Sequence, residues 1–351
     1  MDGKDTITVF GIMSGTSLDG LDLARVKFSR TGDGDWAYKL LEFSCEDFPA
    51  ELRRKLEHSM TLSGLELSEL DVQWADFAAE CMSRMRGDID LIASHGHTVF
   101  HRPEKGFTVQ IGSGAVLAAR TGKPVVCDLR SLDVAYGGTG APLIPIVDEL
   151  LFSEYDACVN LGGFSNVSMN IDSEIRAWDM GPCNNLLNRL AKEIGLEYDK
   201  DGELASTGSI HKKLLEELLN LGYHRLPAPK SLGMEWINED VLPVLEKWSE
   251  LSLGYKLRTA VEYIARIIAV ELPQGQVLFT GGGARNLFLM ERIRELAFQS
   301  NVVVPSGELI DAKEAIGFAF LGLLRWRREE NVRKSVTGAR IASSGGAVWV
   351  P

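Results

Sequence analysis

Short apolar runs, each followed by a turn of glycine and small polar residues, alternate along this chain with longer segments whose apolar residues recur at helical spacing. Residues 7–29 show the first pattern, an apolar run that breaks at Ser14-Gly15-Thr16-Ser17 and then resumes. Helical periodicity predicts helices at 49–62, 69–85, 184–194, 210–220, 257–270, 287–298 and 312–328. Such alternation is typical of an α/β protein.

Two parts of the chain repeat the same order of elements. Residues 7–29 contain an apolar strand, a glycine-rich turn and a second strand, and residues 156–172 and 174–182 repeat this order with a third strand added. Each half then has a second glycine junction after an apolar strand, at 88–100 in the first half and 276–286 in the second. The pattern predicts a duplicated sheet-and-helix unit, with ligands at the carboxyl ends of its strands.

The length of 351 residues fits two domains, with a boundary near the proline- and glycine-containing region 128–150. We expect a first domain of residues 1–131 plus about 338–351, and a second of residues 132–337. The net charge of −12, from 37 basic and 49 acidic residues, disfavours a nucleic-acid partner. No signal peptide or long apolar run is evident, and five scattered cysteines lack CxxC spacing, so we expect a cytoplasmic protein with reduced thiols and no membrane partner.

The turn Ser14-Gly15-Thr16-Ser17 is a candidate phosphate site. Successive backbone N–H groups beside small side chains form a concave nest for an anion. Asp19 follows and could hold Mg²⁺, directly or through water. A plain hairpin turn is the alternative, while the P-loop and GxGxxG patterns are both missing.

Two further glycine turns lie in the second half. Residues 160–166 contain Gly162 and Gly163 at the place equivalent to the first turn, so the pair could hold a polyphosphate between the domains. Residues 279–286 end an apolar strand with Gly281, Gly282 and Gly283 before Asn286 and a helix. Bare glycines allow a base or ribose to lie against backbone, and a tight strand-to-helix turn is the alternative, although such a turn seldom needs three glycines.

Asp179 ends a predicted strand before a Gly-Pro turn, where its carboxylate could take a proton during phosphoryl transfer, or only serve as a turn or cap residue. His95, His97 and His101 lack the spacing of known zinc motifs, so hydrogen bonding to a polar substrate or a structural role is favoured over metal binding.

Two charged residues complete the set of candidates. Arg130 could bind a phosphate or substrate hydroxyls, or pair with Asp133. Glu314 follows Asp311 by three residues, the spacing of a capping box at the start of the last helix, and is also a candidate substrate contact.

A series of short segments is spread over nearly the whole chain: GIMSGTSLDGLD, SHGHTVFHRP, VQIGSGAVLAARTGKPVVCDLRS, GGTGAPLIP, NLGGFSN, WDMGP, PAPKSLG, GGGARNLFLM, EAIGFA and SVTGAR. In these segments and their order, the chain resembles the anhydro-N-acetylmuramic acid kinase family. The resemblance implies a duplicated actin-like ATPase (ribonuclease H-like) fold, with two domains around a nucleotide cleft, and a homodimer. It also implies ATP-dependent opening of the 1,6-anhydro ring with phosphorylation at O6, a step of cell-wall recycling that uses ATP and Mg²⁺.

The resemblance assigns roles to the candidate residues. Asp179 matches the catalytic aspartate that activates water. The first phosphate motif corresponds to residues 14–17 with Asp19, the second to Gly162 and Gly163, and the adenosine motif to residues 281–283. Asn286 is expected to bind ATP as well. The sugar side of the cleft corresponds to His97, Arg130 and Glu314.

The chain departs from the family pattern near the expected sugar pocket. Where the family usually has Thr-Gly-Pro-Gly-Asn, this chain has Met180-Gly181-Pro182-Cys183-Asn184. Where the family has an aspartate a few residues later, this chain has Asn188, and His97 stands where glutamine is more common. These changes leave two alternatives open: a kinase for another anhydro-sugar or sugar, and a non-catalytic ATP-binding regulator of the same fold.

Overall fold

The computed structural model describes residues 6–15 and 18–351, and the chain divides into two compact units. Unit 1 comprises Met1–Leu151 and Ala312–Pro351, and unit 2 comprises Phe152–Asp311. These divisions lie about 20 residues after the expected first boundary and about 26 before the expected second. The reason is packing, because helix α5 (Pro145–Leu151) contacts strand β3 (Trp36–Glu46) of the first sheet, and the main part of the last long helix packs against strand β1 (Thr6–Ser14).

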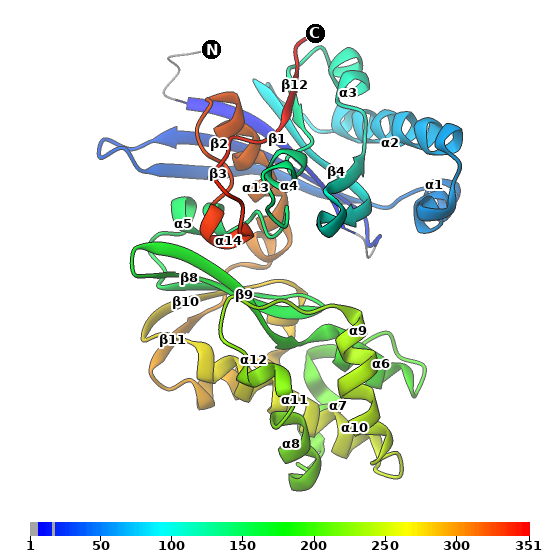
Figure 1. Cartoon of the computed structure of the whole chain (residues 1–351), viewed down its shortest axis with the longest axis vertical. Coiled ribbons are helices and arrows are strands. Elements are labelled where there is room, and N and C mark those ends of the chain that lie inside the picture. The colour runs from blue at the N-terminus through cyan, green and yellow to red at the C-terminus, as the bar shows by residue number, and fades with distance from the viewer. Residues whose placement is uncertain (1–5, 16–17) are drawn as a thin grey trace. The chain divides into compact units, whose positions relative to one another are not determined.

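The sheet of unit 1 has the strand order β12-β6-β4-β1-β2-β3, with β5 paired to β4. Figure 1 labels β1, β2, β3, β4 and β12 of this sheet. The other strands are β2 (Leu21–Arg30), β4 (Leu91–Arg102), β5 (Phe107–Ile111), β6 (Val125–Cys127) and β12 (Ala347–Trp349). Strands β1, β2 and β3 form an antiparallel meander, while β4 runs parallel to β1 and β6 parallel to β4.

The sheet of unit 2 repeats this arrangement, in the order β11-β10-β7-β8-β9. Its strands are β7 (Ala157–Leu161), β8 (Phe164–Ile171), β9 (Glu174–Pro182), β10 (Gly275–Thr280) and β11 (Ser300–Val303). Again the first three strands form an antiparallel meander and the next two are parallel. The shared order, third-second-first-fourth-fifth, confirms the predicted duplication and the ribonuclease H-like fold of each half.

Helices complete both units. Unit 1 has α1 (Ala50–Glu57), α2 (Gly64–Arg84), α3 (Gly114–Thr121), α4 (Ser131–Ala135), α5, α14 (Lys334–Thr337) and most of α13 (Gly307–Trp326). Unit 2 has α6 (Asn184–Lys192), α7 (Glu203–Thr207), α8 (Lys212–Leu219), α9 (Met234–Trp236), α10 (Leu242–Glu246), α11 (Leu253–Glu271) and α12 (Leu287–Leu296). In the part of the chain that the structure describes, no helix combines the length and apolar character needed to cross a membrane.

Each unit is stabilised by its own apolar core. Leu23 and Trp74 are fully buried in unit 1, and Phe279 and Ile264 are fully buried in unit 2. Each large aliphatic or aromatic side chain buried in this way contributes about 1.5–3 kcal/mol relative to its exposed state. Both sheets therefore provide rigid supports for the residues at their strand ends.

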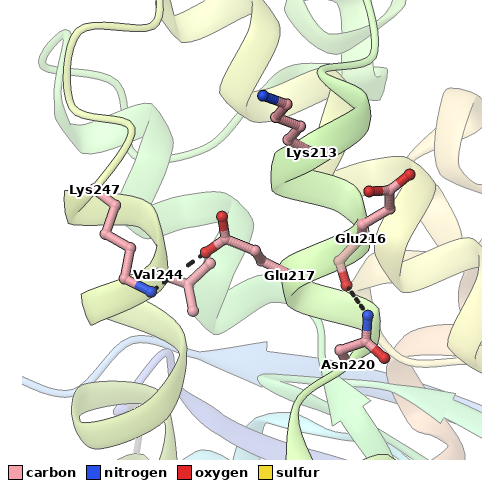
Figure 2. Close-up of a pocket in the computed structure, with 6 residues that line it drawn as sticks. All are labelled: Lys213, Glu216, Glu217, Asn220, Val244 and Lys247. Atoms are coloured by element: carbon pink, nitrogen blue, oxygen red, sulfur yellow. Dashed lines mark hydrogen bonds and ion pairs between the residues drawn. The ribbon is translucent and has the colours of Figure 1, made fainter.

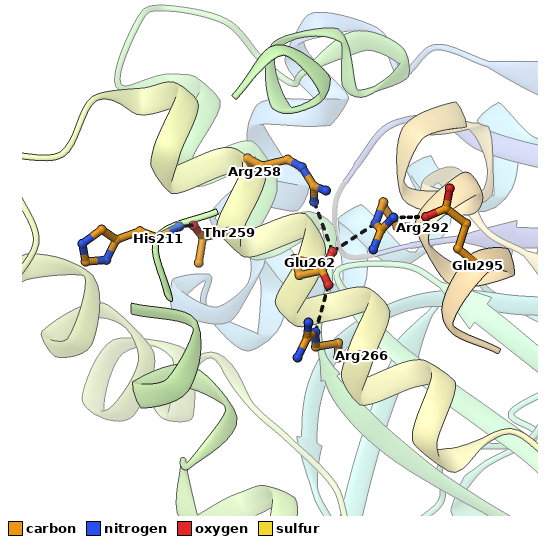
Figure 3. Close-up of polar contacts among 7 residues, drawn as sticks. All are labelled: His211, Arg258, Thr259, Glu262, Arg266, Arg292 and Glu295. Atoms are coloured by element: carbon orange, nitrogen blue, oxygen red, sulfur yellow. Dashed lines mark hydrogen bonds and ion pairs between the residues drawn. The ribbon is translucent and has the colours of Figure 1, made fainter. Parts of the chain in front are cut away.

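An ion-pair cluster joins α11 to α12 in unit 2 (Figure 3). The carboxylate of Glu262, whose side chain is 1% exposed, lies 3.2 Å from Arg258, 2.9 Å from Arg266 and 3.0 Å from Arg292. Burial alone would raise the pKa of Glu262, but hydrogen bonds from Arg266 and Arg292 hold it below its usual value. Since α12 directly follows the three-glycine turn, this cluster helps to fix that turn.

The predicted start of the last long helix is wrong. Helix α13 begins at Gly307, with the hydroxyl of Ser306 accepting a hydrogen bond from the Leu309 N–H at 3.4 Å. Asp311 therefore lies inside the helix and is not its N-cap, and Glu314 is not the glutamate of a capping box. The carboxylate of Asp311 instead pairs with Arg285 at 2.5 Å.

The predicted end of the first-half strand at the His95 junction is also wrong. Strand β4 continues to Arg102, because it pairs with the antiparallel strand β5 from His97 onward, and His97 is also the last residue that it pairs with β1. Gly96 has φ +72°, and a Cβ there would lie 2.4 Å from the Ile111 carbonyl oxygen, so glycine is required at this change of partner.

Candidate active site

The first group of candidate residues in unit 1 lies where β1 ends beside β4. Ser14 is the register partner of His97, and its hydroxyl lies 3.1 Å from His97 Nδ1. Burial lowers the pKa of His97 to about 4, so the imidazole is neutral at pH 7 and Nδ1 can accept the Ser14 proton. Thr16 and Ser17 lie outside the described residues, while Gly15 accepts a hydrogen bond from Leu18 N–H at 3.3 Å.

Asp19 is exposed, just beyond this turn. Among residues 6–15 and 18–351, there is no cluster of three or more His, Cys, Asp or Glu side chains suited to a metal ion. His101 Nδ1 lies 3.1 Å from the Thr108 hydroxyl. A single exposed carboxylate is nevertheless compatible with Mg²⁺, which usually keeps several waters and uses one or two protein carboxylates.

A buried histidine holds Arg130 in unit 1. His95 Nδ1 donates to the Gly96 carbonyl at 2.9 Å, so Nε2 is the acceptor for Arg130 Nε at 3.0 Å and Nη2 at 2.9 Å. Arg130 Nη1 also donates to the Gly140 carbonyl at 2.7 Å. Burial lowers the pKa of Arg130 to about 10, partly offset by Glu314, so the guanidinium remains charged at pH 7.

Asp133 does not pair with Arg130, which was one of the sequence-based alternatives. Its fully buried carboxylate accepts hydrogen bonds from the Gly140 N–H at 2.8 Å and the Thr337 hydroxyl at 2.7 Å. It therefore fixes the glycine turn whose carbonyl holds Arg130. Glu314 is an exposed residue of α13 in the same unit.

Asp179 does not end its strand as predicted, because β9 continues to Pro182. The residue is held at three points in unit 2. Its N–H donates to the Lys230 carbonyl at 3.0 Å, its carbonyl accepts from the Tyr223 hydroxyl at 2.7 Å, and its Oδ2 accepts from the Leu232 N–H at 2.8 Å. Burial raises the pKa of Asp179, while the Leu232 N–H acts in the opposite direction. The side chain thus has the fixed orientation and increased basicity that suit a general base.

Gly162 and Gly163 connect the β7–β8 turn to the start of α6. The Gly163 carbonyl accepts from the N–H groups of Cys183 at 2.9 Å and Asn185 at 3.1 Å, and the Gly162 carbonyl accepts from Asn184 N–H at 3.1 Å. A Cβ at Gly163 would lie 2.7 Å from the Asn185 amide. The turn therefore brings backbone from β7 and the N-terminus of α6 together near Asp179's strand.

The three glycines after β10 have different environments. Gly281 has φ +81°, and a Cβ at Gly281 or Gly283 would come within 2.9 Å of Leu161. A Cβ at Gly282 would meet only the Asn184 amide, at 3.9 Å. Two of the glycines are thus required by packing against β7, which the sequence analysis did not foresee, and Gly282 alone of the three faces open space.

Asn286 has a structural role at the end of this motif. Its side chain accepts a hydrogen bond from the Leu289 N–H at 3.0 Å and caps α12. This capping fixes the direction of the helix that follows the glycines.

A separate surface hollow lies between α8 and α10 (Figure 2). It is lined by Lys213, Glu216, Glu217, Asn220, Val244 and Lys247. Lys247 and Glu217 pair across it at 3.3 Å. The hollow shares no residue with the candidate site and has no chemistry that would connect it to phosphoryl transfer.

Comparison with known proteins identifies the family. The sequence model of the family "Anhydro-N-acetylmuramic acid kinase" matches residues 7–351. The chain is 37% identical to the anhydro-N-acetylmuramic acid kinase of Haemophilus influenzae, with 97% of each chain covered, and 35% identical to that of Pasteurella multocida, with 98% and 97% covered. The chain belongs to the anhydro-N-acetylmuramic acid kinase family.

Among solved structures, a ROK family glucokinase from Streptomyces griseus in complex with glucose and AMPPNP is similar at 13% identity and a TM-score of 0.40, with 90% of this chain and 99% of that chain covered. The assignment to the anhydro-N-acetylmuramic acid kinase family rests on the sequence match, which confirms the predicted family. The sequence allowed a structural role for His95 but did not reveal that its partner is Arg130. The only signal of that role was the SHGH spacing, which places His95 and His97 on the same face of a strand.

Proposed function

We propose that this protein is an ATP-dependent anhydro-N-acetylmuramic acid kinase that opens the 1,6-anhydro ring and phosphorylates O6. The product is N-acetylmuramic acid 6-phosphate, and the reaction belongs to cell-wall recycling. The observation that carries the proposal is Asp179, whose backbone makes two hydrogen bonds and whose carboxylate accepts a third from the Leu232 N–H, in a chain that matches the kinase family from residue 7 to 351.

In the proposed reaction Asp179 takes a proton from water. The water oxygen forms a bond to C1 of the sugar while the C1–O6 bond breaks. O6 then forms a bond to the γ-phosphorus of ATP, while the bond between the γ-phosphorus and the oxygen that leaves with ADP breaks. The second proton of the water stays on the new C1 hydroxyl. The raised pKa of Asp179 favours the proton transfer, and the Leu232 N–H keeps the carboxylate oriented.

The nucleotide is proposed to use the glycine turns of unit 2. Gly281 to Gly283 would bind the adenosine part, with Gly282 the position at which the backbone faces open space. Gly162 and Gly163 would bind phosphate, as would the hydroxyl and N–H groups of residues 14–17. Asp19 would hold Mg²⁺, directly or through water; when bound, the ion neutralises part of the charge on the phosphates.

The sugar is proposed to contact His97, Arg130 and Glu314. Arg130 offers N–H donors for hydroxyl or carboxylate oxygens from a position fixed by His95 and Gly140. Neutral His97, bonded to Ser14 through Nδ1, can donate from Nε2. A homodimer and a cytoplasmic location are part of the same proposal, and light scattering of the purified protein tests the first.

Mass analysis of the sugar product tests this function. The protein is incubated with ATP, Mg²⁺ and anhydro-N-acetylmuramic acid, with Asp179→Asn in parallel and a panel of other anhydro-sugars and sugars. We expect a product heavier by one water and one phosphoryl group, formed by the wild type and lost in the variant. If only another sugar gives a phosphorylated product, that sugar is the substrate. If ATP is lost slowly, at the same rate in both proteins and independently of any sugar, the result favours a non-catalytic ATP-binding regulator.

A further inference from the structure

The segment Lys230–Leu232 lies against Asp179 and controls its surroundings. It provides the Lys230 carbonyl for the Asp179 N–H, at 3.0 Å, and the Leu232 N–H for Oδ2, at 2.8 Å. The segment belongs to no helix or strand, since it lies between the short helix Gly222–Arg225 and α9. Its position therefore depends on side-chain anchors.

The anchor is the side chain of Lys230. This side chain is only 5% exposed, and its Nζ lies 3.3 Å from Glu271 Oε1 at the end of α11 and 4.9 Å from the centre of the Tyr223 ring. Burying an ammonium group is costly unless it is paired, so such a lysine is held in one place. The same Tyr223 donates its hydroxyl to the Asp179 carbonyl at 2.7 Å. One cation thus connects α11, Tyr223 and the backbone around Asp179.

We propose that Lys230 is a positioning residue for the reaction, acting through the backbone of Leu232 to hold the carboxylate of Asp179. This inference rests on the proposed function, in which Asp179 is the base. Lys230 itself touches neither proton donor nor substrate in this scheme. Its contribution is the fixed position of one N–H group.

The electrostatic consequence has a definite sign. The Leu232 N–H stabilises the ionised carboxylate and lowers the pKa of Asp179 against the effect of burial. The other titratable groups around it are Tyr223, His224, Lys230 and Glu271; burial lowers the pKa of His224 to about 4 and keeps that ring neutral at pH 7. Releasing the segment should therefore raise the pKa of Asp179 and move the acid limb of kcat to higher pH.

The test compares Lys230→Met, which keeps the length but removes the charge, with Lys230→Arg, which keeps the charge. Lys247→Met is the matched control, because Lys247 makes an ion pair of the same 3.3 Å length with Glu217 but is 65% exposed. For Lys230→Met we expect kcat at pH 7 to fall about tenfold and the acid limb to move up by about 1 pH unit, with an unchanged KM for ATP. Lys230→Arg should keep most of the wild-type kcat and most of the wild-type position of the acid limb. Lys247→Met should change neither kcat nor the acid limb.

A second readout does not need activity. The carboxyl carbon of Asp179, labelled with ¹³C and assigned by its loss in Asp179→Asn, is titrated in the substrate-free full chain by NMR. The inference predicts a higher pKa in Lys230→Met than in the wild type, whether or not the sugar is phosphorylated. If the wild type is inactive, the proposed function is wrong, but this titration still tests whether Lys230 positions the carboxylate of Asp179.

An unchanged acid limb and an unchanged Asp179 pKa in a folded Lys230→Met protein would overturn the inference. If that variant does not fold, Glu271→Gln takes its place, because it weakens the anchor without unpairing a buried cation completely. It should shift the Asp179 pKa in the same direction by a smaller amount, and no shift there would likewise overturn the inference.

Discussion

Units 1 and 2 have the same strand order but use the ends of equivalent strands differently. In unit 1, the junction on β4 has His95 and His97, which bond to Arg130 and Ser14 through side chains. In unit 2, the equivalent strand β10 ends in three glycines, and the candidate carboxylate, Asp179, is held by backbone groups.

The difference shows what a duplicated scaffold keeps and what it can change. The meander and the parallel strands place a strand end at the same point of each sheet, while the residues there differ in kind. Backbone and glycine suit a nucleotide that must lie close to the chain, and fixed polar side chains suit a sugar with many hydroxyls. We therefore propose that unit 2 carries the adenosine site and the base, and that unit 1 selects the sugar.

The largest effect is expected in unit 2, from Asp179→Asn. Removing the base should lower kcat by about 10³-fold while the Kd for ATP stays the same, because the amide keeps the Leu232 hydrogen bond but cannot take a proton. Steady-state kinetics and calorimetric titration with ATP measure the two quantities. A parallel loss of ATP binding would mean that Asp179 supports the nucleotide site and would break the assignment.

Glu262→Gln tests whether the support behind the glycine turn is as important as the turn itself. Removing the charge that three arginines share in the α11–α12 cluster should lower the free energy of unfolding by about 3 kcal/mol. Glu149→Gln is the matched change in unit 1, where the side chains of Arg333 and Glu149 are 28% and 25% exposed against 1% for Glu262, and should cost under about 1 kcal/mol. Denaturant unfolding compares them, and equal losses would contradict the importance of burial.

The two glycine variants Gly283→Ala and Gly282→Ala separate packing from binding. A methyl group at position 283 would meet Leu161, so we expect a loss of stability of about 2 kcal/mol. At position 282 the methyl group meets open space, so stability should be kept while the KM for ATP rises several-fold. A Gly282→Ala enzyme with normal ATP kinetics would show that no part of the nucleotide lies there.

Arg130→Lys tests the sugar-selecting role of unit 1. A lysine ammonium cannot bond to both His95 Nε2 and the Gly140 carbonyl in the geometry of the guanidinium, so the KM for the sugar should rise about tenfold. The KM for ATP is expected to stay constant. A rise in the KM for ATP without a rise in the KM for the sugar would contradict the assignment of sugar selection to unit 1.

The smallest effect is the pH dependence of His97. The pKa of about 4 in the folded state lies below the ordinary histidine pKa of about 6.5, so the unfolded chain binds a proton first as the pH falls. The stabilisation is therefore complete above pH 6.5 and is lost as the pH falls toward 4, by about 1–2 kcal/mol between pH 7 and 5. Urea unfolding of His97→Gln at pH 7 and pH 5 should show a smaller difference in the free energy of unfolding than the wild type does. An unchanged difference would refute the attribution of this pH dependence to His97.

Much of the fold was predictable because it depends on local patterns and on repetition. The apolar runs predicted the paired meanders, and α12 begins at Leu287 as expected. The start of α13 was not predictable in the same way. Asp311 and Glu314 have capping-box spacing, but the Ser306 hydroxyl caps the chain one turn earlier. Two valid local signals competed, and sequence alone does not rank them.

The candidate site shows a similar limit. Arg130 and the glycine turns could be selected from the sequence because each follows an apolar strand, and Asp179 because it precedes a Gly-Pro pair, although β9 continues past it to Pro182. The contact of His95 with Arg130 and the fit of Gly281 against Leu161 could not, since each joins residues that the fold brings together from distant parts of the chain. Such pairings decide which candidates are held in place and by what.

The central claim, that Asp179 directs water to the anomeric carbon while O6 takes the phosphoryl group, is tested most directly in oxygen-18-labelled water. The enzyme is run for one brief incubation with ATP, Mg²⁺ and anhydro-N-acetylmuramic acid, and the sugar phosphate and any free phosphate are analysed by fragment mass. The account predicts one labelled oxygen on C1 of the phosphorylated sugar and none in its phosphoryl group. Label in free phosphate with an unopened sugar, or a phosphorylated sugar without label at C1, would contradict it.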